Sequence, residues 1–196
     1  MHILHIDSSI QGEQSVSRRL SAAVVRRLRD LRPDARIVYR DLAAAPLPHL
    51  SPAMIEAAHG SEPDATALSS ALDEVLAADV IVVGTPMYNF GVPSQLKSWL
   101  DALAAPGRTF RYGPQGPEGL LGDKRVIVAS ARGGFYGPGA PGAGNDHQES
   151  YLRAFFGFLG VTDIEVVRAE GVRIAPDVAE RAVAAALEQV ARLQAA

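Results

Sequence analysis

Short runs of apolar and β-branched residues alternate along the chain with stretches of helical periodicity, and this alternation constrains the fold most. The runs lie at residues 2–7, 36–42, 79–86, 124–130 and 163–169. The third and fourth runs are almost continuously apolar, which is typical of strands buried on both faces of a parallel sheet. The sequence therefore predicts a doubly wound α/β fold whose five parallel strands are joined by right-handed crossovers.

Apolar residues recur at helical spacing between the predicted strands, and we expect each stripe to face the sheet. These stripes lie in residues 20–31, 68–76, 96–103 and 178–193. Pro93 suits the first turn of the third helix, because its missing N–H would be unpaired there anyway. Helices are therefore expected on both faces of the sheet, and residues 1–196 are predicted to form one domain.

The composition excludes several classes of function. Cysteine is absent, which removes disulfides, thiolate metal sites and cysteine nucleophiles. The 22 acidic and 19 basic residues give a net charge of −3, which offers no electrostatic case for nucleic acid. None of the five histidines has metal-site spacing, and no apolar run approaches the roughly 20 residues that span a bilayer. Because no signal peptide is recognised either, we expect a soluble cytoplasmic protein without metal, membrane or nucleic-acid partners.

Two stretches rich in glycine and proline interrupt the alternation, at residues 104–123 and 133–144. Long loops inside a compact domain are usually lids or binding loops, and the alternative is a surface excursion. Phe110 and Tyr112 in the first stretch have no obvious core of their own to enter, so we expect them to pack against a partner surface. Trp99 is expected to pack against the sheet.

A ligand is expected at the carboxyl ends of the first, third and fourth strands, because open parallel sheets bind ligands where the strand order reverses. The loop after the first strand carries Ser9, Ser15 and Ser17 just before a helix. Hydroxyls and free N–H groups at a helix N-terminus suit a phosphate, although serine also caps helices with no ligand present. Arg18 and Arg19 are interpreted as solvated helix residues.

The loops after the third and fourth strands suit a flat heteroaromatic ring. Residues 86–91 place two aromatic side chains and an amide directly after a buried strand. Gly133 and Gly134 follow the fourth strand and let the backbone approach a ligand closely, unless they serve only a tight turn. Neither a dinucleotide-binding glycine pattern nor a P-loop is present.

At these residues the chain resembles the FMN-dependent NADH-azoreductases, members of the flavodoxin-like group of quinone reductases, over nearly its whole length. The most specific element is Pro86-Met87-Tyr88-Asn89-Phe90, followed by Pro93, Leu96, Lys97 and Asp101. The resemblance implies a flavodoxin-like fold that binds FMN. It assigns Ser9, Ser15, Val16 and Ser17 to the phosphate, Met87, Tyr88, Asn89 and Phe90 to the ring, and Ala131, Arg132, Gly133 and Gly134 to a second ring loop. Ala131 stands where that family usually has serine.

The resemblance also implies a homodimer with flavin sites at the subunit interface, ping-pong electron transfer and broad substrates. The predicted activity is an FMN-dependent NAD(P)H oxidoreductase that reduces quinones and azo compounds by two-electron hydride transfer. No nucleophile–base pair is visible, which fits a cofactor that carries the chemistry, so no catalytic residue is assigned. The acceptor used in the cell, the choice between NADH and NADPH, and the role of His147 stay open.

Two other functions stay open at this point. A flavodoxin-like FMN electron carrier would need a protein partner, but such carriers are usually strongly acidic and lack two long loops. The net charge of −3 therefore argues against a carrier. The second is an interaction module that kept the fold and binds no flavin.

Overall fold

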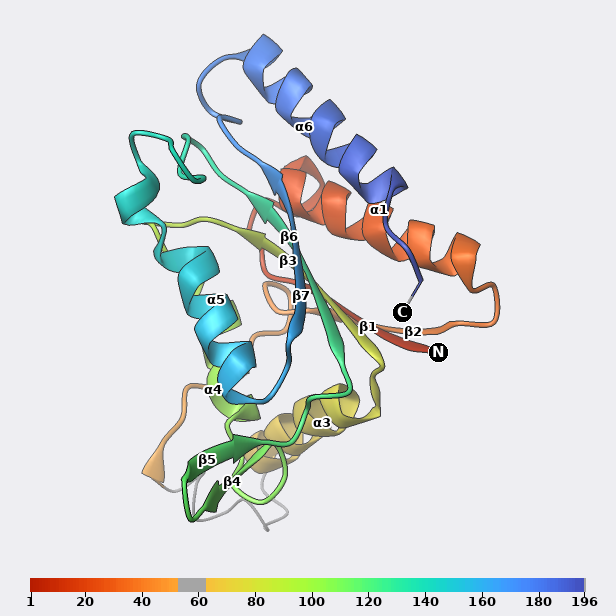
Figure 1. Ribbon diagram of the computed structural model, residues 1–196, viewed down its shortest axis with the longest axis vertical. Coiled ribbons are helices and arrows are strands. Elements are labelled where there is room, and N and C mark those ends of the chain that lie inside the picture. The colour runs from red at the N-terminus through yellow and green to blue at the C-terminus, as the bar shows by residue number, and fades with distance from the viewer. Residues whose placement is uncertain (53–62, 196) are drawn as a thin grey trace.

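The five apolar runs form one parallel sheet with helices on both faces (Figure 1). The computed structural model describes residues 1–52 and 63–195. In order across the sheet the strands are β2 (Arg36–Asp41), β1 (His2–Asp7), β3 (Val80–Pro86), β6 (Arg125–Ala131) and β7 (Asp163–Ala169). Each predicted run matches its strand to within one residue at either end, and the predicted α/β fold with five parallel strands is confirmed.

Helices cover the two faces of the sheet unequally. One face carries α1 (Val16–Leu31) and α6 (Pro176–Ala191), and the other carries α3 (Pro63–Ala77), α4 (Ser94–Leu103) and α5 (His147–Phe158) (Figure 1). All the predicted helical stripes fall within these helices or close to their ends. The connection from β1 to β2 crosses one face of the sheet through α1, and the connection from β2 to β3 crosses the other through α3. The strand order therefore reverses between β1 and β3, where a crevice is expected at the carboxyl ends.

The core is split in two because side chains alternate between the faces of a strand. On β3, Val80 and Val82 belong to the cluster under α1 and α6, while Ile81 and Val83 belong to the cluster under α3, α4 and α5. A strand buried on both faces therefore reads as a continuous apolar run, and all seven residues of β3 are buried. The apolar pattern of this segment thus fixes its place at the centre of the sheet.

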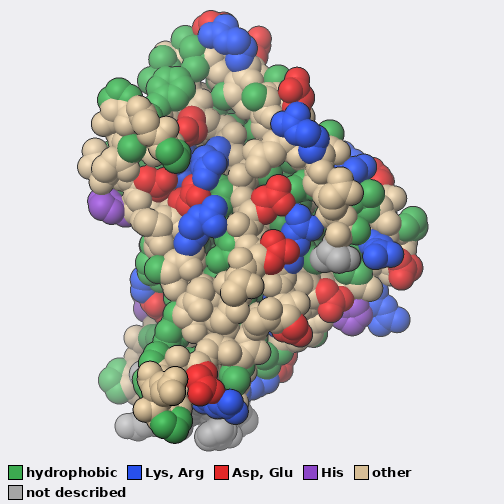
Figure 2. Space-filling model, in the orientation of Figure 1, with side chains coloured by type: hydrophobic (Ala, Val, Ile, Leu, Met, Phe, Trp, Pro, Cys, Tyr) green, Lys and Arg blue, Asp and Glu red, His purple; other side chains and the backbone are tan. Residues whose placement is uncertain are grey.

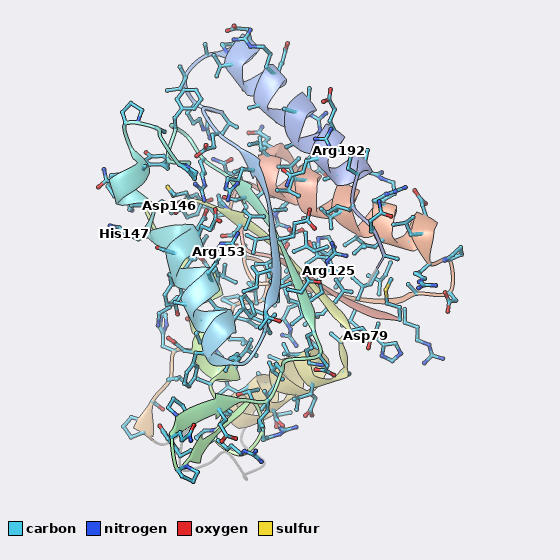
Figure 3. All side chains as sticks on the ribbon, viewed as in Figure 1. Asp79, Arg125, Asp146, His147, Arg153 and Arg192 are labelled. Atoms are coloured by element: carbon cyan, nitrogen blue, oxygen red, sulfur yellow. The ribbon has the colours of Figure 1, made fainter. Side chains whose placement is uncertain are left out.

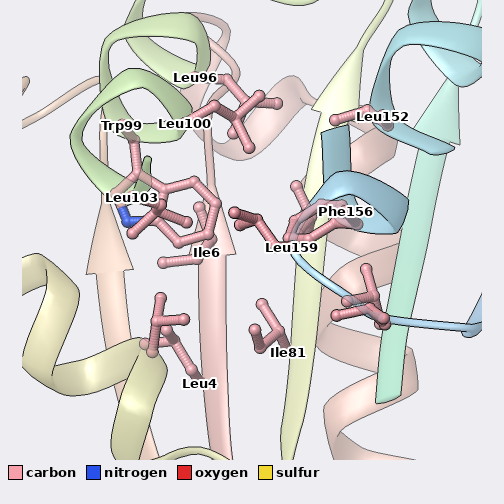
Figure 4. Close-up of a cluster of buried hydrophobic side chains, with 14 of the residues drawn as sticks. Leu4, Ile6, Ile81, Leu96, Trp99, Leu100, Leu103, Leu152, Phe156 and Leu159 are labelled. Atoms are coloured by element: carbon pink, nitrogen blue, oxygen red, sulfur yellow. The ribbon is translucent and has the colours of Figure 1, made fainter. Parts of the chain in front are cut away.

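Trp99 lies in the larger core cluster, as expected from its helical spacing (Figure 4). It is fully buried beside Leu103 and Ile6, and Figure 4 shows α4 resting on the sheet through these side chains. The indole nitrogen of Trp99 is buried without a hydrogen-bond partner among the described residues. The burial of Trp99 is therefore apolar packing.

The 104–123 stretch contains a hairpin that the sequence did not predict. Strands β4 (Phe110–Gly113) and β5 (Gly116–Gly119) pair antiparallel at the bottom of Figure 1, and Leu121 N donates to Leu159 O just before β7 begins. This is the end of the sheet opposite the carboxyl ends, so the stretch is not a lid over that edge of its own chain. The expectation for Phe110 was also wrong, since Phe110 is buried in the core against Phe158.

Helix α5 is the one helix of the main sheet layers whose stripe was not singled out from the sequence. Asp146 caps it, because its carboxylate accepts hydrogen bonds from the backbone N–H groups of Gln148 and Glu149 at 3.2 and 3.0 Å. Leu152 and Phe156 are spaced by four residues and enter the core. The capping residue Asp146 and this spacing were the sequence features from which α5 could have been predicted.

No helix in residues 1–52 or 63–195 combines the length and apolar character that a membrane span requires. The same described residues contain no group of three or more histidine, aspartate or glutamate side chains placed to hold a metal ion. His59 lies outside the described residues.

Candidate functional site

A cleft of about 330 Å³ opens at the carboxyl ends of the central strands. Four loops line it, namely those after β1, β3, β6 and β7. The lining residues are Gln11, Gln14, Ser15, Val16, Pro86, Met87, Tyr88, Ala131, Gly133, Val172 and Arg173. Two larger hollows, of about 470 and 620 Å³, lie beside α3 and at the amino ends of the strands, and neither touches these loops. A third, of about 710 Å³, touches only one of them, the loop after β1, at Gly12 and Glu13. The cleft is therefore the place where the predicted ligand loops meet.

Ser15 begins α1 and serves as its cap. Its Oγ accepts the backbone N–H of Arg18 at 3.3 Å and lies 3.1 Å from the Oγ of Ser17. The N–H groups of Val16 and Ser17 in the first helical turn have no helical acceptor, as at every helix start. Capping and anion binding are therefore compatible here, because the cap uses a lone pair of Ser15 and leaves those two donors free of helical partners.

Tyr88 joins the loop after β3 to the loop after β1. Its hydroxyl lies 3.5 Å from the Oγ of Ser9 and accepts the N–H of Ile10 at 3.4 Å. Ser9 itself is fully buried, and its Oγ accepts the N–H of Gln11 at 3.3 Å. Ser9 thus shapes the loop from behind, while Tyr88 faces the cleft.

Arg18 is not the solvated residue expected from the sequence. Its guanidinium forms a two-pronged ion pair with Asp41 at 2.6 and 2.7 Å and also donates twice to the carbonyl of Ser9. The bond from Arg18 lowers the pKa of Asp41. Burial, together with the nearby carboxylates of Asp7 and Asp41, raises the pKa of Tyr39 to about 12. Arg18 therefore fixes the loop after β1 to the end of β2.

The loop after β3 holds two strained residues. Asn89 and Phe90 have φ angles of 47° and 71°, in the left-handed region that non-glycine residues rarely adopt. Tyr88 and Gly91 exchange backbone hydrogen bonds of 3.1 and 3.0 Å around them, which makes a tight primed-type turn. Strain of about 1–3 kcal/mol per residue persists only where the surroundings impose it and is typical of ligand loops. Asn89 and Phe90 are exposed at the rim, outside the lining of the cleft.

Gly133 and Gly134 behave differently from each other. Neither has a positive φ, so the tight-turn explanation does not apply. Gly133 lines the cleft, and a Cβ there would lie 3.4 Å from the Cγ of Arg173. Gly134 lies outside the lining, and its missing Cβ leaves room for the ring of Tyr136 at 3.3 Å. Of the two, only Gly133 is placed where a ligand would approach.

The side chain of Arg132 is not among those that line the cleft. It is fully buried, and its guanidinium lies 2.8 Å from Asp146 and 3.3 Å from both Glu149 and Glu170. It also donates to the hydroxyl of Ser130 at 3.1 Å. Arg132 therefore ties the end of β6 to the start of α5 and to the loop after β7.

Gln148 extends this network to the ring loop. Its amide nitrogen donates to the carbonyl of Pro86 at 2.7 Å, and its amide oxygen accepts the hydroxyl of Ser130 at the same distance. The N–H of Met87 donates to Ala131 O at 2.8 Å. The loops after β3 and β6 are thus held together by buried bonds, which is the preorganisation a ring site requires.

Glu149 links the buried network to the surface. Burial alone would raise its pKa, but hydrogen bonds from Arg168 and Arg153 outweigh burial and hold the pKa of Glu149 below its ordinary value. Figure 3 shows Arg153 on α5 and Asp146 with His147 at its start. His147 is exposed and does not line the cleft, so the geometry gives it no contact there.

The structure brings together half of the residues predicted to bind FMN. Six line the cleft: Ser15, Val16, Met87, Tyr88, Ala131 and Gly133. Six lie behind it or at its rim: Ser9, Ser17, Asn89, Phe90, Arg132 and Gly134. Five lining residues were not assigned to FMN from the sequence: Gln11, Gln14, Pro86, Val172 and Arg173, of which Pro86 begins the motif that was singled out. The signal for the last two was the carboxyl end of the fifth strand, which follows the same rule as the other loops.

The residues of the cleft fit FMN. A helix N-terminus with Ser15 lies at one side, which suits a phosphate, and Met87 and Tyr88 lie at another, which suits a flat ring. No aspartate or glutamate is among the residues that line the cleft, so nothing there repels an anion.

Comparisons with known proteins agree with this geometry. A family model described as a flavodoxin-like fold matches residues 1–193. The chain is 52% identical over 202 residues to the FMN-dependent NADH:quinone oxidoreductase 2 of Bradyrhizobium diazoefficiens, covering 100% of both chains. It is 54% identical over 198 residues to the FMN-dependent NADH:quinone oxidoreductase of Sinorhizobium fredii, covering 97% of this chain and 96% of that one.

Among solved structures, an azoreductase from Bacillus anthracis is similar with a TM-score of 0.87 and 33% identity, covering 98% of this chain and 97% of that one. An FMN-dependent NADH-azoreductase from the same species, solved in complex with FMN, gives a TM-score of 0.83 at 25% identity, covering 98% of this chain and 99% of that one.

Proposed function

The chain belongs to the flavodoxin-like fold family, and on that premise we propose that it is an FMN-dependent NADH:quinone oxidoreductase that also reduces azo compounds. The observation that carries the proposal is the cleft, where the start of α1 and the strained loop after β3 meet at the carboxyl edge of the sheet. The relatives are oxidoreductases, which favours this function over an electron carrier that depends on a protein partner.

FMN, when bound, supplies the hydride chemistry, and the residues of this chain hold and orient it. The N-terminus of α1 and the Ser15 hydroxyl would hold the phosphate. Met87 and Tyr88 would lie along the ring, and the backbone at Gly133 would approach it where no side chain intervenes. Gln148 keeps the two ring loops in register from behind.

The test is reconstitution followed by a steady-state assay. The purified protein is expected to bind one FMN per chain, and the loaded protein to oxidise NADH with a benzoquinone and with an azo dye, with no other protein added. The apo protein is the control. FMN binding without NADH oxidation would favour an electron carrier, and absence of FMN binding would favour an interaction module.

Ping-pong kinetics and a preference for NADH over NADPH belong to the same proposal. One open ring face cannot stack the nicotinamide and the acceptor together, so parallel double-reciprocal lines are expected. Intersecting lines would require a ternary complex and would contradict alternating binding. The ratio of kcat/KM for the two nucleotides measures the preference, which rests on the names of the relatives.

We also propose a homodimer in which exposed apolar side chains of one chain pack on the other. Tyr112 is 78% exposed, and it and the exposed Phe158 both pack against Phe110. Leu120, Phe90 and Phe135 are also exposed. Apolar surface of this kind is typical of interfaces. Light scattering at micromolar concentration should give twice the chain mass, and Tyr112→Ser should lower it, whereas a fully active monomer would contradict the proposal.

Apart from the second copy of the chain, the proposed partners are small molecules. The proposed location of the protein is the cytoplasm. Figure 2 shows acidic and basic side chains interspersed on one face, with no large patch of a single sign there. Such a surface, with a net charge of −3, does not favour nucleic acid.

A further inference from the structure

Arg173 is the one charged residue among those that line the cleft. It is exposed, and no ion pair joins it to another residue in the described part of the chain. The guanidinium of Arg173 therefore gives the cleft one positive charge.

The loop after β7 holds Arg173 in place through its backbone. The N–H groups of Gly171, Val172 and Arg173 donate to the carbonyls of Gly134, Arg132 and Gly133 at 2.9, 3.1 and 3.2 Å. Gly171 has a φ of 75°, which starts the turn that brings the next two residues back along the ring loop. The chain after β7 therefore runs beside residues 132–134 as a short backbone ladder.

The stem of Arg173 packs on Gly133. A Cβ added to Gly133 would lie 3.4 and 3.5 Å from the Cγ and Cβ of Arg173, so this glycine provides the space over which the stem passes. Both contacts, one through the backbone and one through the stem, join Arg173 to the loop assigned to the ring. Neither joins it to Ser15, where the phosphate is expected.

Arg18 and Arg132, whose guanidinium groups lie against these loops, are already paired. Arg18 is bound to Asp41 and to the carbonyl of Ser9, and Arg132 is buried among three carboxylates. The phosphate end has its own positive character from the N-terminus of α1. Arg173 is thus a positively charged side chain without an ion-pair partner among the described residues, beside the loop assigned to the ring.

We propose that Arg173 stabilises the negative charge that FMN gains on reduction, and so sets its reduction potential; this rests on the proposed function. A hydride from NADH would bring two electrons and one proton to bound FMN and release NAD⁺, and the ring would then carry one negative charge. A cation near the ring would bind the reduced, negatively charged form more tightly than the neutral oxidised ring. The two electrons and the proton then pass to the quinone or azo acceptor, which takes up a second proton from solvent.

The experiment measures FMN affinity and midpoint potential separately. Oxidised FMN and riboflavin are titrated against wild type, Arg173→Gln and Arg173→Lys, and the midpoint potential of each FMN-loaded protein is then measured at pH 7.5. Arg181→Gln is the matched control, because Arg181 is exposed on α6, is paired with Asp177 and does not line the cleft.

For Arg173→Gln we expect the ratio of reduced to oxidised FMN affinity to fall about tenfold, which lowers the midpoint potential of this two-electron couple by about 30 mV. Arg173→Lys should retain part of the effect, Arg181→Gln should match wild type, and the affinity for oxidised FMN should stay within about twofold.

An unchanged potential in Arg173→Gln would overturn the proposal. A second outcome would also overturn the proposal: Arg173→Gln binds FMN more weakly, but its riboflavin binding and midpoint potential are unchanged. Arg173 would then contact the phosphate and not the ring. Failure of wild type to bind oxidised FMN is a separate result, and it would overturn the proposed function itself.

Discussion

Replacing Arg132 by methionine should destabilise the apo protein while leaving FMN binding nearly intact. The substitution keeps an unbranched stem of similar length but removes the guanidinium that three carboxylates and the Ser130 hydroxyl surround. The resemblance to azoreductases assigned this residue to the ring loop, and the fold instead buries its side chain completely. The two roles give opposite outcomes.

The expected cost follows from burial and from the partners left behind. Removing one member of a buried ion pair typically costs 3–5 kcal/mol, because the remaining charge is left unpaired. The side chains of Asp146, Glu149 and Glu170 keep 13–20% of their surface exposed, and Glu149 retains Arg153 and Arg168. These features place the cost near the lower limit, at about 3 kcal/mol, or about 6–12 °C in melting temperature for a domain of this size.

The assay is thermal unfolding of the apo protein at pH 7, followed by an FMN titration at a temperature where both proteins are folded. Arg168→Met is the matched control, because Arg168 also pairs with Glu149 but its side chain is 31% exposed, so we expect a loss of at most about 1 kcal/mol. A melting temperature unchanged in Arg132→Met, together with lost FMN affinity, would refute the reasoning and return Arg132 to the flavin.

Three further predictions follow from other parts of the site. Replacing Ser15 and Ser17 together by alanine should weaken FMN binding by about 1–3 kcal/mol but not riboflavin binding, by fluorescence titration, with about 1 kcal/mol of stability lost through the Ser15 cap. Glu149→Gln should destabilise the protein at pH 7. Because folding lowers the pKa of Glu149, the difference in stability between this variant and wild type should be fully present above the ordinary pKa near 4.5. It should disappear in thermal melts as the pH falls through the lowered pKa of the folded protein. Gly133→Val should abolish FMN binding with a nearly normal apo melt, whereas Gly134→Ala, which meets only the ring of Tyr136, should keep FMN affinity within about threefold.

The sequence pattern did not distinguish the surroundings of Gly133 from those of Gly134. Two adjacent glycines after a buried strand looked equivalent in sequence, and both were expected to clear space for a ring. In the fold their missing side chains face different neighbours, Arg173 for Gly133 and Tyr136 for Gly134. Both residues lie in a bend after β6, which turns the two missing side chains to different neighbours, and only Gly133 lines the cleft.

Arg18 and Phe110 are missed for the same kind of reason. The partner of Arg18 is Asp41, 23 residues away on a strand that becomes a neighbour only because β2 pairs with β1. Phe110 finds a core because Phe158, at the end of α5, is brought beside it. Neither contact leaves a periodic trace in the sequence around the residue.

The sequence by itself determined the elements and the edge of the sheet at which a ligand is expected. Strand and helix periods are properties of consecutive residues, so the strands at 2–7, 79–86 and 163–169 can be recognised from the local sequence. Parallel sheets bind ligands at the carboxyl ends of their strands, and this rule then selects the loops. The tertiary structure alone decided which side chains in those loops face the cleft. It placed Arg132 in a buried network and Arg173 in the lining of the cleft, because the surroundings of each depend on which distant loops the strand order places beside it.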